Sequence, residues 1–294
     1  MKKLYPFFIT LMLYLLGPGS SNAQTVLDAI AQDSGGKLGA SLLVIETGQS
    51  LWVNPDAAFP MQSVYKLPIV MAALAAVDHN KFKLEQKILV KHEELLTGEQ
   101  HSPLRDAHPE GNFKITVEDL MRYAITESDS SASDVLLRLL GGPASVMHYL
   151  DQLGIHGMQV LDTEKEIDKS WNVQYRNTST PKAMINLLQA LHQGKALKPA
   201  SQALLIKWMS ETKTGQSRIK GMLPAGTPVA HKTGTSSSLN GLTAAHNDVG
   251  IVTLPNGHHM AVAIFLYEST APEVSRDLSI AKITRVGWDA WSGK

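Results

Sequence analysis

Strand-like segments occur at both ends of this 294-residue chain, with a long helical stretch between them. Near the N-terminus, two apolar segments at 38–45 and 51–53 flank a polar turn, which is the pattern of a hairpin. Near the C-terminus, residues 228–232, 242–254 and 259–267 are strand-like, and a Pro-Asn-Gly turn joins the last two. The five segments predict one antiparallel sheet built from both ends of the chain.

The central stretch carries helix start and stop signals. Thr116 followed by Asp119 has the spacing of a capping box, and Thr180 stands before a proline as an N-cap does. Gly141 follows an apolar helical segment, in the position of a C-terminal cap. An apolar stripe over residues 272–291 predicts a terminal helix.

These patterns predict an α/β plus all-α fold, in which a five-stranded antiparallel sheet is flanked by helices and a helical lobe is inserted. We expect one domain over residues 24–294, with an α/β lobe at about 24–58 and 212–294 and a helical lobe at about 59–211. A ligand site is expected where the lobes meet. Residues 161–179 are charged and aperiodic, and a loop of that length is usually functional.

The N-terminus has the parts of a secretory signal peptide. Two lysines precede an apolar run over residues 4–16, and small residues follow up to Ala23. The run is shorter than the roughly 20 residues that a membrane span needs. We therefore expect a signal peptide over residues 1–23, a mature periplasmic chain that begins at Gln24, and no membrane contact after cleavage.

The amino-acid composition limits the kinds of reaction and ligand that we expect. The chain has no cysteine, so an exported form has neither disulfides nor a thiol nucleophile, and hydroxyl chemistry is expected. The 27 basic residues balance the 27 acidic ones, which predicts a small-molecule ligand rather than a nucleic acid or a membrane surface. The eleven histidines contain no His-x-His-x-Asp cluster, so we expect no zinc-dependent chemistry and no metal or cofactor. We expect a monomer.

Three short motifs carry candidate chemistry. Ser63 and Lys66 share one helix face, where a desolvated lysine can act as the base for the hydroxyl. Ser128 and Ser130 flank an aspartate between two helical segments, a pattern that an ordinary N-cap cluster also produces. A Lys-Thr-Gly motif begins at Lys232 on a predicted strand, and its glycine allows a ligand to approach the backbone. Each motif alone is weak, whereas the ordered combination is specific.

The combination resembles that of class A serine β-lactamases, and the resemblance covers essentially the whole mature chain. It is closest to the PER and VEB extended-spectrum branch, through residues 60–64, 171–175 and 230–236. The resemblance implies the β-lactamase/transpeptidase-like fold. It also implies hydrolysis of penicillin- and cephalosporin-type β-lactam rings through a serine acyl-enzyme, which confers antibiotic resistance and requires no cofactor.

By position, the resemblance implies that Ser63 is the nucleophile, Lys66 its proton partner and Ser128 the relay to the leaving nitrogen. Lys232 completes the catalytic group and helps to bind the substrate carboxylate. The backbone N–H groups of Ser63 and Thr235 would form the oxyanion hole.

The resemblance also implies a substrate-binding set around the Lys-Thr-Gly motif. Thr233, Gly234 and Thr235 would hold the substrate carboxylate, with Arg218 beneath that pocket. The alternative role for Arg218 is a surface salt bridge. His101 matches a rim position that an aromatic residue usually occupies, where it would stack on substrate.

The long loop offers two carboxylates for the deacylating water. The alignment of residues 171–175 with the branch places Glu164 at the catalytic position and leaves Glu166 as the alternative. Two departures from the family pattern stand nearby. Ser130 replaces an asparagine, and its hydroxyl cannot span lysine and substrate as an amide does. Asp168 replaces an asparagine or histidine, and a second carboxylate beside Glu164 would form a coupled pair.

Two other functions share these motifs. A D-alanyl-D-alanine peptidase of the penicillin-binding family has the same three motifs, and the loop carboxylate argues against it. A slowly deacylating β-lactam sensor is favoured by the departures at Ser130 and Asp168. Measured turnover distinguishes these functions.

Overall fold

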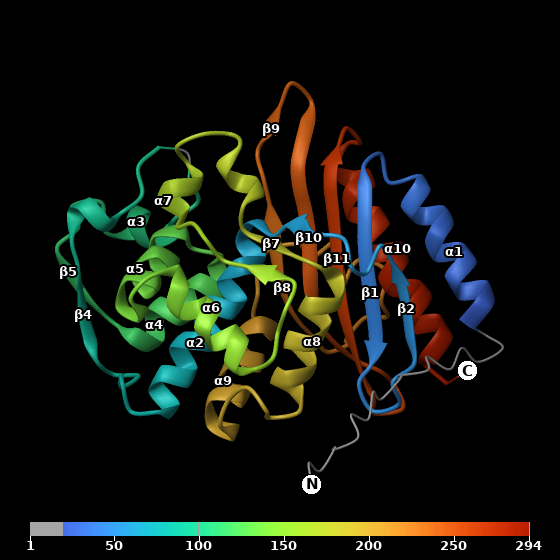
Figure 1. The fold of residues 1–294 in the computed structure, drawn as a ribbon, viewed down its shortest axis with the longest axis horizontal. Coiled ribbons are helices and arrows are strands. Elements are labelled where there is room, and N and C mark those ends of the chain that lie inside the picture. The colour runs from blue at the N-terminus through green and yellow to red at the C-terminus, as the bar shows by residue number, and fades with distance from the viewer. Residues whose placement is uncertain (1–19, 99, 294) are drawn as a thin grey trace, which may run out of the picture.

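The computed structural model describes residues 20–98 and 100–293, and its centre is one antiparallel sheet (Figure 1). The strands run in the order β2-β1-β11-β10-β8, and every neighbouring pair is antiparallel. They are β1 (Lys37–Val44), β2 (Ser50–Val53), β8 (Val229–Thr235), β10 (Leu242–Thr253) and β11 (His259–Ser269). The predicted five-stranded sheet is confirmed. A sixth strand, β9 (Ser238–Leu239), pairs with the beginning of β10 and is too short to show a period-two pattern.

Helices from the two chain ends cover one face of the sheet. In Figure 1, α1 (Ser20–Gln32) and α10 (Glu273–Trp291) lie together on the right of the sheet. Their apolar side chains share a buried cluster with β1, β2 and β11 that includes Leu27, Leu42, Val262, Ile283 and Trp288. The predicted terminal helix is therefore confirmed. Burial of this apolar surface ties the N-terminal and C-terminal segments into one layer.

The helical segment covers the other face. α8 (Pro181–His192) contacts β1, β10 and β11, α9 (Pro199–Ser210) contacts β8, and further helices complete the lobe. They are α2 (Lys66–Asp78), α3 (Pro103–Ala107), α4 (Val117–Arg122), α5 (Ser130–Leu140), α6 (Pro143–Gln152) and α7 (Glu164–Ile167). Shorter elements are the 3-10 turns Gln62–Tyr65, His92–Glu94 and Val173–Tyr175, the π turn Tyr123–Glu127, and the strands β3 (Phe59–Pro60), β4 (Lys87–Val90), β5 (Phe113–Thr116), β6 (Met158–Gln159) and β7 (Thr178–Ser179).

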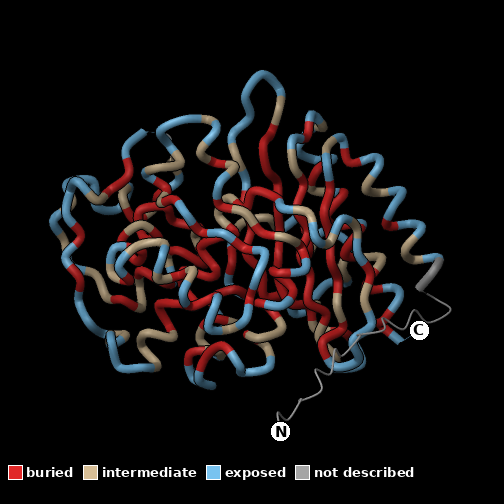
Figure 2. The backbone as a smooth tube through the Cα atoms, viewed as in Figure 1, coloured by how far each residue is buried: buried red, intermediate tan, exposed pale blue. Residues whose placement is uncertain are grey.

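Helix α2 forms the centre of this lobe. Its first nine residues, 66–74, are all buried, and Figure 2 shows buried backbone concentrated through the middle of the molecule. A helix that is apolar on every side must be surrounded by other elements. Because Lys66 begins this buried helix, its ammonium group lies at the core rather than on the surface.

The predicted helix ends are confirmed. The Thr116 hydroxyl accepts from the backbone N–H of Asp119 at 3.0 Å, and the Thr180 hydroxyl accepts from the N–H of Ala183 at 3.0 Å. Gly141 ends α5 with φ = 96°, a left-handed conformation that glycine adopts without strain. Local side-chain chemistry therefore sets these boundaries.

The loop over residues 161–179 is ordered by its own polar contacts. The amide oxygen of Asn177 accepts from the backbone N–H groups of Leu161 (2.7 Å) and Asp162 (3.0 Å), and its amide nitrogen donates to the Asp162 carbonyl (2.9 Å). The segment also contains α7 and a 3-10 turn. Its lack of sequence periodicity reflects these short elements and not an absence of structure.

The predicted signal peptide lies mostly outside the described residues, because the structure describes the chain only from residue 20 onward. Residues 20–23 begin α1. Within the described part of the chain, no helix combines the length and the apolar character needed to cross a membrane.

Candidate active site

A distorted turn presents the Ser63 hydroxyl at the entrance to α2. The preceding residue, Gln62, has φ = 47°, a left-handed conformation that residues other than glycine adopt rarely. Its side-chain amide donates to the Gln174 amide oxygen at 2.9 Å, and the Asn247 amide donates to the Met61 carbonyl at 3.0 Å. Contacts from distant segments therefore stabilise the strained turn. Sequence reasoning placed Gln62 and Gln174 in the stretches that carry the family resemblance but did not predict these contacts.

The Lys66 ammonium lies at the centre of the site and is fully buried. Its Nζ donates to the Ser63 hydroxyl (3.0 Å), the Ser128 carbonyl (2.7 Å) and the Ser130 hydroxyl (3.0 Å). Glu164 Oε1 lies 3.0 Å from the same nitrogen. Since an ammonium group has three N–H donors, these four oxygens compete for them, and rotation about the Cε–Nζ bond can turn an N–H toward Glu164.

Glu164 Oε1 keeps a free lone pair in a buried position. This atom accepts no hydrogen bond from any of the described residues. A buried carboxylate oxygen without a donor costs free energy unless it serves another purpose. Such an atom can accept a proton from a group that reaches it.

The backbone of Glu164 is held by Asp134, a residue that sequence reasoning missed. The Asp134 carboxylate accepts from the N–H of Glu164 at 2.7 Å and from the N–H of Lys165 at 3.0 Å. Burial, and then the negative charge of Glu164, raise the Asp134 pKa from 3.8 to about 7. An aspartate in the middle of α5 gives no sequence signal for this contact across 30 residues.

The second loop carboxylate points elsewhere. Glu166 forms a partly exposed ion pair with Lys169, whose Nζ lies 2.7 Å from its oxygens. The two carboxylates on α7 therefore differ in environment, because Glu164 contacts the buried Lys66 ammonium and Glu166 contacts a surface lysine.

A second buried lysine faces Ser128 from the sheet. Lys232 Nζ donates to the Ser128 hydroxyl and to the Thr233 carbonyl, each at 2.8 Å. Burial, followed by the charge of Lys66, lowers the Lys232 pKa well below its usual range. Ser128 has φ = 59°, and this left-handed conformation allows its carbonyl to contact one lysine while its hydroxyl contacts the other.

The aspartate of the second motif is structural. Asp129 is fully buried and accepts from the N–H groups of Leu104 and Ala132, each at 2.7 Å, and from the Ser102 hydroxyl. It caps the N-terminus of α5, so the N-cap interpretation of this motif holds for Asp129. The cap also fixes the backbone that carries Ser128.

The end of β8 lies directly against the nucleophile turn. A Cβ atom on Gly234 would lie 2.3 Å from the Met61 carbonyl oxygen, so only glycine allows this approach. Beside it, the Thr233 hydroxyl lies 2.5 Å from the Thr214 hydroxyl, and Thr235 is exposed at the strand end. The strand therefore presents hydroxyls and backbone next to the nucleophile turn.

Arg218 supports this strand end from below. Its guanidinium donates to the Thr235 hydroxyl (2.8 Å) and the Asn247 carbonyl (2.9 Å), and it forms an ion pair with Asp277 (3.0 Å). Asp277 also contacts His246 at 2.7 Å. Arg218 is buried, so the structure places a positive charge under Thr235 and shows a salt bridge at the same residue.

The two remaining sequence candidates lie at the rim. The exposed His101 ring contacts the Glu127 carbonyl at 2.8 Å, and its own carbonyl accepts from the Ser130 N–H at 3.1 Å. The Asp168 carboxylate is exposed and accepts from the Gln100 amide at 3.1 Å. The coupling that we predict between Asp168 and Glu164 therefore stays a prediction.

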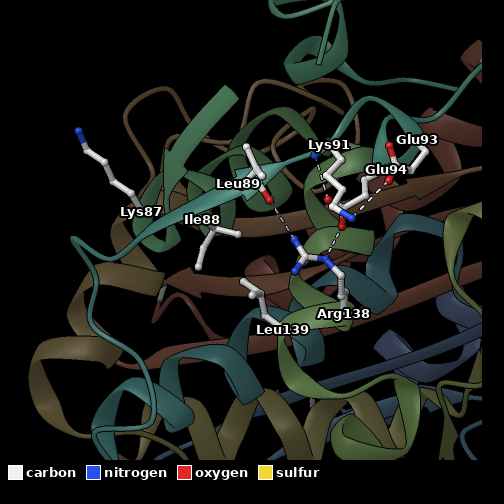
Figure 3. A pocket seen from close by; sticks show the side chains of 8 residues that line it. All are labelled: Lys87, Ile88, Leu89, Lys91, Glu93, Glu94, Arg138 and Leu139. Atoms are coloured by element: carbon white, nitrogen blue, oxygen red, sulfur yellow. Dashed lines mark hydrogen bonds and ion pairs between the residues drawn. The ribbon is translucent and has the colours of Figure 1, made fainter. Parts of the chain in front are cut away.

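Another cleft lies on the outer surface of the helical lobe and contains none of the motif residues (Figure 3). Arg138 crosses it, donates to the Leu89 carbonyl at 3.3 Å and pairs with Glu94. Its lining is Lys87, Ile88, Leu89, Lys91, Glu93, Glu94, Arg138 and Leu139. Arg138 and Lys91 are paired with glutamates and the lining contains no serine, so this cleft lacks the chemistry of the Ser63 site.

Fold and site together define a serine acyl-transfer enzyme. A hydroxyl at the start of a buried helix contacts a buried lysine, and a carboxylate and a second lysine complete the group. This constellation supports nucleophilic catalysis by proton transfer along a contiguous set of polar atoms.

Comparisons with known proteins identify the family. The model of the β-lactamase enzyme family matches residues 22–291. The chain is 36% identical over 281 residues to β-lactamase VEB-1 of Pseudomonas aeruginosa, with 93% of each chain covered. It is 39% identical over 240 residues to extended-spectrum β-lactamase PER-1 of the same organism, covering 82% of this chain and 78% of that one. A solved class A β-lactamase from Bacteroides cellulosilyticus is 30% identical with a TM-score of 0.89, covering 95% and 100%.

The chain belongs to this family and is a class A serine β-lactamase. The resemblance to the PER and VEB branch is likewise confirmed.

Proposed function

We propose that this chain opens the β-lactam ring of penicillin- and cephalosporin-type antibiotics through an acyl-enzyme on Ser63, and that Glu164 activates the water that hydrolyses it. The observation that supports this proposal most directly is the environment of Glu164 Oε1. This buried atom lies 3.0 Å from Lys66 Nζ and accepts no hydrogen bond from the described residues. The family membership supports the overall reaction.

In the acylation step, the Lys66 ammonium first passes a proton to Glu164 Oε1 and becomes a neutral amine. Ser63 Oγ then attacks the lactam carbonyl and transfers its proton to this amine, so no net charge builds up at the core. The separations of 3.0 Å from Nζ to both oxygens support this relay. The backbone N–H groups of Ser63 and Thr235 are the proposed oxyanion donors, a contribution of roughly 3–4 kcal/mol per donor.

The ring C–N bond then breaks, and the nitrogen takes a proton from the Ser128 hydroxyl. Lys232 Nζ, 2.8 Å from that hydroxyl, stabilises the oxygen while the proton is away. The Ser128 oxygen then receives the proton that Glu164 took, by way of Lys66, so Glu164 is a carboxylate again before deacylation. Thr233, Gly234 and Thr235 bind the substrate carboxylate at the end of β8, and the Arg218 guanidinium beneath Thr235 adds positive charge. His101 is proposed to contact substrate at the rim.

Deacylation separates a hydrolase from an acylated sensor. Glu164 takes a proton from water, the resulting hydroxide attacks the ester carbonyl, and the Ser63 oxygen leaves with a proton returned through Lys66. Asp134 holds the Glu164 backbone in place for this step. A peptidase of the penicillin-binding family or a sensor is not favoured, because the named relatives are β-lactamases.

We also propose that the protein is exported, cleaved after Ala23 and monomeric in the periplasm. The Gln24 side chain supports this cleavage point, since its amide donates to the Trp52 carbonyl at 2.7 Å and accepts from the Trp52 N–H at 3.3 Å. Cleavage before Gln24 keeps these contacts. N-terminal sequencing of secreted protein tests the proposal, and a mature chain that retains residues 4–16 would contradict it.

The experiment for the proposed function is steady-state hydrolysis of a chromogenic cephalosporin by the purified protein and by Ser63→Ala. We expect multiple turnovers by the parent and a loss of several orders of magnitude in the variant. A single stoichiometric burst from the parent would instead identify a slowly deacylating sensor.

A further inference from the structure

Three metal-binding side chains converge at one end of the main sheet. Glu46 follows β1, His192 ends α8 and His259 begins β11. One ligand atom from each residue can be chosen so that all three lie within 4.8 Å of one another. We propose that these residues form a binding site for a divalent transition metal, with zinc as the best match to two imidazoles and one carboxylate.

The present distances are close to those of a coordination sphere. Glu46 Oε1 lies 2.7 Å from His259 Nδ1 and 3.7 Å from His192 Nε2. Zinc bonds of about 2.0–2.1 Å in tetrahedral geometry place two donors about 3.4 Å apart. Both separations therefore reach that value with shifts of less than about 1 Å, which side-chain rotation supplies.

The backbone already orients the three ligands. The Ile45 N–H donates to the His259 carbonyl at 2.9 Å, and the His259 N–H donates to Glu46 Oε2 at 2.8 Å. The Gln202 amide donates to the His192 carbonyl at 2.8 Å. The first and last of these bonds fix the backbone of the two histidines, and the bond to Glu46 Oε2 fixes a ligand side chain, a contact that raises metal affinity. Glu46 Oε2 is thus held by the backbone, while Oε1 forms a hydrogen bond with His259 Nδ1 at 2.7 Å that a metal ion would replace.

The local electrostatics also favour a cation. His192 is the last residue of α8, where the helix dipole carries partial negative charge. Burial and then the neighbouring His259 lower the His192 pKa, while the charge of Glu46 acts to raise it. Burial acts to raise the Glu46 pKa, but hydrogen bonds from His259 outweigh it and hold the pKa below its usual value.

The site is open on one side and remote from the reaction centre. Each of the three side chains is about 30% exposed, and the adjoining cleft is lined by Ile45, Gln193, Gly194 and Gln202. A fourth ligand position is therefore available to water. Gly234 pairs with Asn247, which pairs with Phe265, six residues along β11 from His259. That separation is roughly 20 Å along the strand.

Because the site lies far from the reaction centre, we assign the metal a structural role. It would clip together the turn after β1, the end of α8 and the start of β11, in a chain that has no disulfide to do so. A ligand that binds only the folded state stabilises it by mass action. The lactamase reaction does not depend on this metal, so metal binding and hydrolysis can be tested separately.

The test is calorimetric titration of tag-free, chelator-treated protein with zinc chloride, followed by thermal denaturation. We expect one zinc per chain, and a rise in Tm of about 5–10 °C at a zinc concentration 100-fold above Kd. His192→Gln and Glu46→Gln should each weaken binding at least about tenfold. His258→Gln is the matched control, since it changes the neighbouring imidazole of the same turn and should bind zinc like the parent.

Zinc-free hydrolysis of a chromogenic cephalosporin should be equal in the parent and all three variants, which verifies their folding. Cobalt(II) bound to the parent should show the intense visible absorption of a tetrahedral site, a readout that needs no variant. The proposal is overturned by the absence of stoichiometric zinc binding or of the tetrahedral cobalt spectrum. Affinity that survives both ligand substitutions, or that His258→Gln reduces equally, also overturns it.

Discussion

Replacing Glu164 with glutamine removes the basicity of one carboxylate while it keeps the side-chain size and the backbone contacts to Asp134. In the parent, Glu164 Oε1 lies 3.0 Å from Lys66 Nζ and accepts no hydrogen bond from the described residues, so it is the atom available to take a proton. Loss of a general base slows the assisted step by roughly 10²–10⁴-fold, which corresponds to about 3–5 kcal/mol in the barrier. The rate of deacylation should show this loss in full.

Acylation should fall less than deacylation in Glu164→Gln, because Lys66 remains in contact with Ser63 at 3.0 Å. The acyl-enzyme should therefore accumulate. Intact-protein mass spectrometry after mixing with a good substrate should show a persistent adduct that the parent lacks, and stopped-flow absorbance should show a burst of one equivalent.

Glu166→Gln is the matched control on the same short helix. Its partly exposed pair with Lys169 contributes less than about 1 kcal/mol, so the variant should turn over like the parent. Trapping by Glu166→Gln and not by Glu164→Gln would show that our alignment of the loop is off by two residues. Trapping by neither variant would refute the proposed deacylation mechanism.

Three further predictions concern the residues around this relay. Ser130→Asn should raise kcat/KM for good substrates, because an amide pairs with lysine and substrate together whereas the hydroxyl already accepts from Lys66; an equal or lower value would contradict this. Arg218→Ala should lower kcat/KM about tenfold for substrates with a carboxylate, through loss of the donor to Thr235, and steady-state kinetics showing no change would refute the assignment. Asp134 has a folded-state pKa raised from 3.8 to about 7, so its contribution to stability is complete below the lower value and is lost as pH rises through the higher one. The free energy of unfolding in urea should therefore fall between about pH 4 and 7 in the parent and fall less in Asp134→Asn, and identical slopes would contradict the shift.

The sheet and the helix ends were predictable because their signals are local. Alternating or continuous apolar segments predict strands, and Thr116, Thr180 and Gly141 act through contacts within a few residues. β9 escaped prediction because two residues cannot show a period. The motif serines and lysines were predictable as candidates because their spacing is short or their order is specific.

The supporting contacts were not predictable from spacing. Asp134 reaches the Glu164 backbone across 30 residues, and Gln62 meets Gln174 across 112. Only the tertiary fold brings such polar groups together. The same reason hides the cluster of Glu46, His192 and His259, whose ligands belong to three separate elements. The roles of Ser130, Asp168 and His101 stay predictions, because the structure gives their partners and not their effect on rate.

The most direct test of the central claim is to locate the acyl group itself. Purified protein incubated with a slowly released β-lactam should gain the mass of one acyl group, and peptide mapping should place it on the peptide that contains Ser63. Ser63→Ala should gain no mass under the same conditions. An adduct on a peptide that contains Ser128 or Ser130, or an adduct that persists in Ser63→Ala, would contradict the assignment of Ser63 as the nucleophile.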